Sequence, residues 1–212
     1  MSSVRRPTRR GAIVGTLGSL SVALISGLAV DILSPSPAVA LSSEEATDLV
    51  LKVADAFENA RDISDSDSAL LQRFRTVLNT YADLPIIARS SLGVEWRSAT
   101  TEQRRAYTNA FSRYMTRKYS RRLRSIIDGD IRILRSRKVR SGVLVESVFA
   151  QKGKSPMTVD WQISDKSGAA KIFNLYIEGV SLLSIERGEI GAMLDESGGD
   201  LDRLIATLDS PG

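Results

Sequence analysis

The side chains that most often carry out catalysis in proteins are missing from this sequence. None of its 212 residues is a cysteine or a histidine. A thiol nucleophile, a thiolate metal site and a Ser-His-Asp triad are therefore excluded, and so are nearly all zinc sites. An enzyme with this sequence would have to work with carboxylates or lysines.

The acidic pairs and the one serine motif that remain are weak candidates for chemistry. Two pairs of aspartates lie in short polar breaks, where turns and helix caps place acids anyway; they are Asp65 with Asp67 and Asp128 with Asp130. The tripeptide Gly-Val-Ser at 179–181 resembles half of a nucleophile elbow, but it lacks the closing glycine and has no histidine to activate the serine. We interpret all three features as structural.

The most polarised feature is a basic run in a segment with helical spacing. From Gln103 to Arg124 the sequence has eight basic residues and no acid: Arg104, Arg105, Arg113, Arg117, Lys118, Arg121, Arg122 and Arg124. The run is either a solvated helix face or a docking surface for an anionic group, such as a phospholipid headgroup, a membrane surface or an acidic partner protein. The C-terminal segment is mainly acidic, so the two regions could also complement each other.

Capping signals and apolar periodicity predict four helices after residue 40. Capping boxes, in which a Ser or Thr is followed three residues later by Glu or Gln, begin at Ser42 and Thr100. Apolar residues at helical spacing predict one helix after each box, the second reaching about residue 127, and two more over residues 70–81 and 84–92.

After residue 130 the pattern changes from helical spacing to alternation. Four alternating segments begin at Ile131, 143, 157 and 173, and short turns between them predict consecutive antiparallel hairpins. Helical spacing returns over 180–193 and 201–208. The predicted fold class is α+β, with N-terminal helices and a C-terminal helical tail packed on one face of a roughly four-stranded antiparallel sheet.

Apolar side chains from both halves are expected to face one shared interior. An ordinary packed core is the simplest interpretation, because periodicity cannot show whether a cavity is left between the layers. The side chains concerned are Leu84, Ile87, Phe111, Tyr114, Met115, Phe149, Trp161 and Phe173.

The first forty residues have the three-part pattern of a cleavable export signal. Four arginines precede residues 11–30, which carry no charge, and Ala38-Val39-Ala40 has small residues where a signal peptidase reads them. Thr8-Arg9-Arg10 favours the twin-arginine pathway, and hence the periplasm. Eight of the twenty uncharged residues are Gly, Ser or Thr, which argues against the alternative of a permanent membrane anchor. We therefore predict a single mature domain, residues 41–212.

Setting this segment aside changes the charge balance. It holds four of the 29 basic residues and one of the 25 acidic residues, so 25 basic and 24 acidic residues remain. The high sequence pI of about 9.5 therefore comes mostly from the arginines of the signal. Bulk charge therefore gives no argument for nucleic acid as a partner.

Four motifs occur in a characteristic order and spacing. They are Leu84-x-x-Ile87-Ala88-Arg89-x-x-Leu92-Gly93-x-x-Trp96, Thr100-x-x-Gln103-x-x-x-Tyr107-x-x-x-Phe111, Glu178-Gly179-Val180-Ser181-Leu182 and Asp200-Leu201-x-x-Leu204-Ile205-x-x-Leu208. Over residues 45–208 the sequence resembles the MlaC family, the periplasmic phospholipid-binding proteins also called toluene-tolerance proteins. One position departs from the family pattern, since Ala170 stands where an aromatic residue usually precedes the last strand.

The resemblance implies an apolar cavity between helices and sheet that holds phospholipid acyl chains. It implies a carrier with bound phospholipid as cargo and no other cofactor, no metal and no catalytic residue. The implied partners are an inner-membrane ABC transporter complex and an outer-membrane lipoprotein complex, with transient membrane contact. Stripe and strand parity then give the predicted acyl-chain contacts: Leu84, Ile87, Phe111, Met115, Val145, Phe149, Trp161, Phe173 and Leu175. The predicted headgroup or membrane contacts are Arg89, Arg113 and Arg117.

Two other classes of function stay open. One is an adaptor without a ligand, which would bind another envelope protein through the basic helix. The other is an isomerase-like enzyme with a buried carboxylate as base. Such an enzyme needs an acid on the apolar face of a strand, whereas Glu146 and Asp160 fall on the opposite parity.

Overall fold

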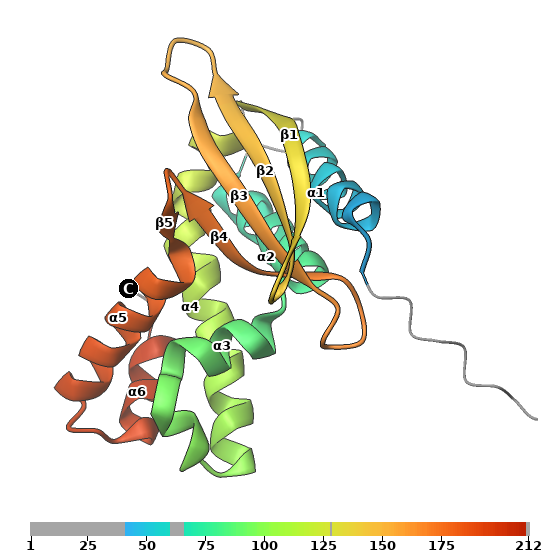
Figure 1. Ribbon diagram of the computed structural model, residues 1–212. Coiled ribbons are helices and arrows are strands. Elements are labelled where there is room, and N and C mark those ends of the chain that lie inside the picture. The colour runs from blue at the N-terminus through green and yellow to red at the C-terminus, as the bar shows by residue number, and fades with distance from the viewer. Residues whose placement is uncertain (1–40, 60–65, 128, 211–212) are drawn as a thin grey trace, which may run out of the picture. The chain divides into compact units, whose positions relative to one another are not determined.

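The structure is a computed structural model that describes residues 41–59, 66–127 and 129–210 (Figure 1). For residue 67 and residues 121–127 it describes the backbone alone. The predicted export signal, residues 1–40, lies outside the described residues, as do Asp65 and Asp128 of the two acidic pairs. In the described part of the chain, no helix combines the length and apolar character needed to cross a bilayer.

Helices precede and follow a five-stranded sheet. The helices are α1 (Ser43–Glu58), α2 (Asp67–Tyr81), α3 (Leu84–Leu92), the 3₁₀-helix η2 (Gly93–Arg97), α4 (Thr101–Ile127), α5 (Leu182–Glu196) and α6 (Leu201–Asp209). The strands are β1 (Gly129–Val139), β2 (Gly142–Gln151), β3 (Met157–Ser164), β4 (Lys171–Ile177) and β5 (Val180–Ser181).

The N-terminal helices begin at the predicted caps. The Ser42 Oγ accepts a hydrogen bond from the Glu45 N–H at 3.1 Å, while the Ser42 N–H donates to the Glu45 carboxylate at 2.9 Å. Thr100 and Gln103 make the same reciprocal pair at 3.1 Å in each direction. Gly93 ends α3 with φ of 73°, a conformation that favours glycine. Both predicted capping boxes are therefore confirmed.

The sheet is an antiparallel meander in the order β1-β2-β3-β4-β5. With helices packed against it, the predicted α+β class is confirmed. The strand count is five rather than four, because Val180 and Ser181 pair with the end of β4 before the chain enters α5. Those two residues carry the helical spacing of the tail, which hid the short strand.

A β-bulge in β4 changes the predicted alternation. Trp161 lies opposite Leu175, but Ile163 lies opposite Ile172, so β4 has one additional residue between them. Ile172 and Leu175 both belong to the apolar packing of the sheet, whereas Phe173 is half-buried and outside it. The expectation that Phe173 shares a face with Leu175 is therefore wrong.

The buried apolar residues form two main clusters rather than one interior. The first, which we call the sheet core, consists of Leu41, Ala46, Val50, Val53, Val77, Val143, Val145, Trp161, Ile163 and Ile172. The second, which we call the helical core, consists of Ala88, Leu92, Tyr107, Ala110, Phe111, Met115, Ile190, Leu194, Leu204 and Leu208. A small third cluster on α2, Leu70 and Phe74, packs against Phe57, Leu78 and Tyr119.

The position of the long helix explains this division. α4 packs mainly against α6, α2 and α3, whereas α1 packs on β1 and β2 (Figure 1). The apolar stripe of α4 therefore faces other helices, and the shared interior expected from the sequence is wrong in this respect. Among the described residues, the small α2 cluster connects the two cores, because it shares Phe57 with the sheet core and Tyr119 with the helical core.

Leu41, the first described residue, is hydrogen-bonded to the residue that follows β3. The Leu41 side chain is buried in the sheet core, and its backbone N–H donates to the Asp165 carboxylate at 3.0 Å. Asp165 follows β3 directly. The chain ahead of α1 is thus fixed to a residue more than a hundred positions later.

Candidate functional site

An open pocket of about 190 Å³ lies between α1 and the first two strands. It is lined by Leu51, Ala54, Asp55, Phe57, Glu58, Gly129, Asp130, Ile131 and Phe149. Its apolar members come from both layers of the fold, while its three acids lie at the end of α1 and the start of β1. The pocket can therefore accept an apolar group between helix and sheet.

Phe149 and Gly129 give the pocket its shape. Phe149 is 6% exposed and lies opposite Ile131 in the antiparallel pairing of β1 and β2. Its ring covers Gly129 so closely that a Cβ atom at position 129 would lie 2.1 Å from the Phe149 Cζ. Any side chain at position 129 would therefore displace this ring.

The pocket continues inward as apolar packing. Ile131 and Phe57 pack against the sheet core, and Phe57 also packs against Leu70 and Phe74 of α2. Pockets that enclose small-molecule ligands usually measure roughly 300–1,000 Å³. At about 190 Å³ the pocket is smaller than this range. A larger apolar ligand would need α1 and the sheet to separate further.

The predicted acyl-chain residues fall into three groups and two single positions. Phe149 lines the pocket, and Val145 and Trp161, with Leu175 packed against them, belong to the sheet core. Phe111 and Met115 belong to the helical core, with Ile87 at its margin. Leu84 is buried at the start of α3, and Phe173 is the bulge residue of β4. The structure therefore brings together Val145, Trp161 and Leu175, places Phe149 in the adjoining pocket, and keeps Phe173 and the members from α4 apart from them.

The predicted headgroup contacts do not all lie together, because Arg113 and Arg117 are neighbours on α4 and Arg89 is on α3. Arg113 makes a two-pronged ion pair with Asp209 of α6, at 2.8 and 2.9 Å. Arg117 donates to the backbone carbonyl of Leu208. Arg89 is exposed in the last turn of α3. Two of these three arginines therefore bind the C-terminal helix. The sequence had left open such a complementarity between the basic run and the acidic C-terminal segment.

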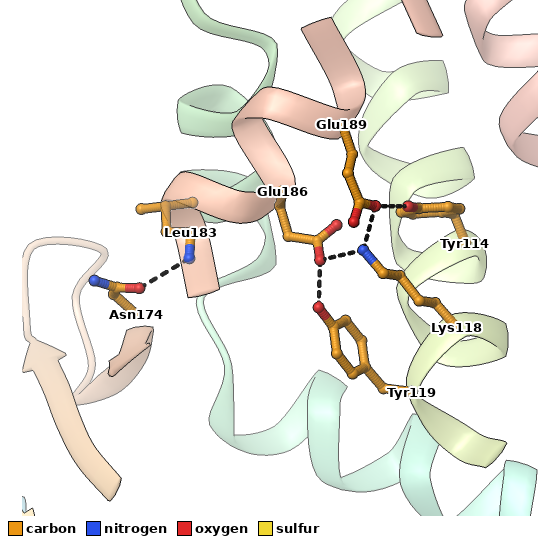
Figure 2. Close-up of polar contacts among 7 residues, drawn as sticks. All are labelled: Tyr114, Lys118, Tyr119, Asn174, Leu183, Glu186 and Glu189. Atoms are coloured by element: carbon orange, nitrogen blue, oxygen red, sulfur yellow. Dashed lines mark hydrogen bonds and ion pairs between the residues drawn. The ribbon is translucent and has the colours of Figure 1, made fainter. Parts of the chain in front are cut away.

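A partly buried polar cluster joins α4 to α5 (Figure 2). Glu186 is fully buried, and its Oε1 accepts hydrogen bonds from Lys118, at 2.6 Å, and from the Tyr119 hydroxyl. Glu189 accepts from Lys118 as well, and from the Tyr114 hydroxyl at 2.8 Å. One ammonium group thus holds two carboxylates from successive turns of α5.

The electrostatics of this cluster favour the protonated forms of its donors. Burial alone lowers the pKa of Lys118, but hydrogen bonds to Glu186 and Glu189 outweigh it and raise that pKa overall. Burial, together with the hydrogen bond to Glu189, raises the pKa of Tyr114 to about 12. Burial and the bond to Glu186 also raise the pKa of Tyr119. The donors therefore keep their protons at neutral pH.

Sequence reasoning missed Glu186, although a signal was present. The buried residues of α5 are Glu186, Ile190 and Leu194, at four-residue spacing. A carboxylate at the first position of an apolar stripe must be paired or must lose its charge. The basic run of α4 supplies the pairing residue, Lys118.

The serine motif at the start of α5 proves to be a turn and a cap. Glu178 and Gly179 both have positive φ angles, of 50° and 76°, and connect β4 to β5. Ser181 accepts a hydrogen bond from the Ser184 N–H at 3.2 Å, which caps α5. The buried amide of Asn174 supports the cap, because its oxygen accepts from the Leu183 N–H at 3.0 Å (Figure 2).

The arrangement gives little support to catalysis or metal binding. Glu186 is absent from the pocket lining, so it does not face the described cavity. Glu146 and Asp160 lie opposite each other, on the face of the sheet away from Val145 and Trp161. Within residues 41–59, 66–127 and 129–210, no three potential ligands gather closely enough to hold a metal ion. What the geometry offers is a small site between two layers, lined by apolar side chains and by three acids.

Two comparisons with known proteins agree with this geometry. The family model described as MlaC protein matches residues 47–210. Among solved structures, the fold is similar to that of a phospholipid-binding protein from Ralstonia solanacearum in complex with a phospholipid, with a TM-score of 0.64. The two sequences are 18% identical, and the match covers 80% of this chain and 100% of that one. At this identity the structural match establishes the shared fold alone.

Proposed function

Because the chain belongs to the MlaC family, we propose that it is a periplasmic phospholipid carrier. It shuttles lipid between the outer and inner membranes as the soluble component of an ABC-type lipid transport system. Phospholipid is its cargo, and its partners are an inner-membrane ABC transporter complex and an outer-membrane lipoprotein complex. The observation that carries the proposal is the pocket between α1 and the sheet, whose apolar side chains continue into the sheet core.

The energetics of lipid transfer support a pocket of this kind. Each methylene group left in water costs about 0.8 kcal/mol, so a sixteen-carbon chain left exposed would cost ~12 kcal/mol. A carrier must therefore cover the acyl chains almost completely. Because the bilayer covers them equally well, exchange between membrane and protein stays close to neutral, and both loading and unloading remain possible.

Loading is proposed to separate α1 from the strands. The acyl chains enter beside Phe149 and take over the contacts of Phe57 and Ile131, which belong to both pocket and core. Val145, Trp161 and Leu175 then form the deeper wall. An apolar chain replaces apolar side-chain contacts in this way, so widening the layer exposes little additional apolar surface to water.

Catalysis is not part of the proposal. A carrier needs no bond-making group, and the comparisons and the pocket between helix and sheet support a binding protein rather than an enzyme. The buried Glu186 is the strongest candidate base, but it is already paired with Lys118 away from the pocket.

Native mass spectrometry of the purified mature protein tests the cargo. We expect one phospholipid per chain after gentle purification, identified by its mass after extraction. A chain that carries none would favour the adaptor instead. A bound small molecule that is chemically converted would favour an enzyme.

A charge at the pocket rim tests its location. Leu51 lines the pocket and is 43% exposed, so Leu51→Glu should leave the fold intact while placing a carboxylate beside the acyl chains. We expect this variant to lose most of its phospholipid. The matched control is Lys52→Glu, which puts the same carboxylate on the next, exposed residue outside the pocket. If both variants retain lipid and keep their helical circular dichroism, the pocket is assigned to the wrong place.

A further inference from the structure

Strand β1 presents a long edge at one side of the sheet. It has eleven residues, and within the described part of the chain β2 is the one strand paired with it. The opposite edge is the two-residue strand β5. Edge strands expose backbone donors and acceptors that another strand can bind.

This edge is also the most basic strand of the sheet. Residues 131–140 contain five basic side chains and no acid, and all five are exposed: Arg132, Arg135, Arg137, Lys138 and Arg140. Glu146 on β2 pairs with Arg135 at 2.6 Å and with Arg137 at 3.0 Å. The other three basic side chains have no ion-pair partner among the described residues.

An apolar residue interrupts the charges near the middle of the strand. The register between β1 and β2 shifts between Ile133 and Arg135, so Leu134 is the additional residue of a bulge. Its side chain is 50% exposed. The edge therefore offers a row of backbone groups, positive charge on both sides and one apolar contact between them.

We propose that the β1 edge binds an extended, acidic segment of a partner protein as an added strand. Main-chain hydrogen bonds would give the affinity, and acidic side chains on the two faces of the added strand would meet Arg132 and Lys138, which lie on opposite faces of β1. An apolar residue between these acids would meet Leu134. The site would bind such a segment whether or not the protein carries lipid, so it does not rest on the proposed function.

The basic charge of β1 favours an acidic strand over two other partners, which are a second copy of this chain and an anionic membrane. Two copies of β1 cannot pair favourably, because every charged residue in 131–140 is basic and like charges would lie opposite one another. A flat anionic membrane would meet Glu146 and Asp160 as well, since both lie on the same face as Arg135. It would also offer no matching row of backbone groups. An acidic strand satisfies both the charges and the backbone.

A designed peptide tests the proposal on the intact mature protein. The probe is a capped peptide of Glu and Thr with a central Val and with Glu on both faces, about six residues long, the length of a typical strand. We expect it to bind, to slow amide hydrogen exchange at residues 131–139, and to lose affinity as salt rises to about 0.15 M. Two control peptides, one with Lys for Glu and one with a central proline, should not bind.

Variants of the protein locate the site. The double variant Arg132→Glu, Lys138→Glu should weaken peptide binding by about tenfold or more. Arg75→Glu, at an exposed position on α2, is the matched control and should bind as the unmodified protein does. The phospholipid content of all proteins is measured in parallel, so that a failure here is distinguished from a failure of the lipid proposal.

Three outcomes would overturn the proposal. One is the absence of binding by the acidic peptide at low salt. Another is binding that leaves exchange at residues 131–139 unchanged or that tolerates the central proline. The third is strong binding of the protein to phosphatidylglycerol vesicles that protects the same residues, which would make the edge a membrane contact.

Discussion

At the scale of single residues, the cluster around Lys118 sets how the protein responds to alkaline pH. Lys118 and the tyrosines Tyr114 and Tyr119 have raised pKa values in the folded protein. Tyr107 behaves in the same way, because burial raises the pKa of its hydroxyl, which is bonded to Ser91 at 2.9 Å. Four groups in the helical half therefore hold their protons more strongly in the folded chain than in the unfolded one.

The sign of the pH dependence follows from linkage. The unfolded chain releases these protons near pH 10, whereas the folded chain keeps them to higher pH, so the free energy of unfolding falls as pH rises from about 10 towards 12. Urea denaturation at a series of pH values measures this fall. We expect Tyr114→Phe to make it shallower, with Tyr176→Phe on β4 as the matched control. Equal slopes for both variants would show that the cluster does not govern alkaline unfolding.

The same scale shows where sequence reasoning stops. Single apolar positions such as Phe149 and Trp161 were identified by strand parity, because alternation has a fixed period of two. Parity fails at Phe173, since a bulge adds one residue without leaving a clear trace in the pattern. The pairing of Arg113 with Asp209 joins residues 96 positions apart, and no local pattern encodes such a pair.

At the scale of elements, the helices could be predicted because their ends are chemically marked. Ser42, Thr100 and Gly93 each fix a boundary through a backbone hydrogen bond or a backbone angle. The packing partner of each helix could not be predicted in this way. An amphipathic stripe on α4 shows that one face is buried, but not that it lies against α6, α2 and α3 instead of the sheet.

The separation of the two cores leads to an expectation about individual elements. If lipid enters between α1 and the strands, the amides of α1, β1 and β2 should change their hydrogen exchange when phospholipid is bound. The amides of α6, which pack in the helical core, should change little. Hydrogen-exchange mass spectrometry of lipid-loaded and delipidated protein compares the two sets within one sample. Equal changes in α6 and α1 would argue that the whole molecule adjusts to the lipid.

At the scale of the whole molecule, the fold class and the order of elements could be predicted, but the division of the core could not. The type of each element depends on local periodicity, which the sequence shows directly. The division of the core into one interior or two depends on which layers pack against each other, and local periodicity does not show this. The small α2 cluster of Leu70 and Phe74, which connects the cores among the described residues, lies in a helix whose apolar spacing does not reveal this role.

The contact between Leu41 and Asp165 has a consequence for maturation. If the signal is cleaved after Ala40, as its Ala-x-Ala pattern predicts, the Leu41 nitrogen becomes the positively charged terminus of the mature chain. The hydrogen bond at 3.0 Å would then become an ion pair, formed only by the processed protein. Removal of the signal would in this way fasten α1 to the sheet at the moment the protein reaches its compartment.

A single added residue tests this link between processing and stability. Placing one glycine before Leu41 moves the charged terminus away from Asp165, and we expect a loss of a few tenths to about 1 kcal/mol in the free energy of unfolding. In an Asp165→Asn background the added glycine should make no difference. An equal loss in both backgrounds would mean that the terminal charge contributes nothing, and that the buried Leu41 side chain alone anchors the start of the chain.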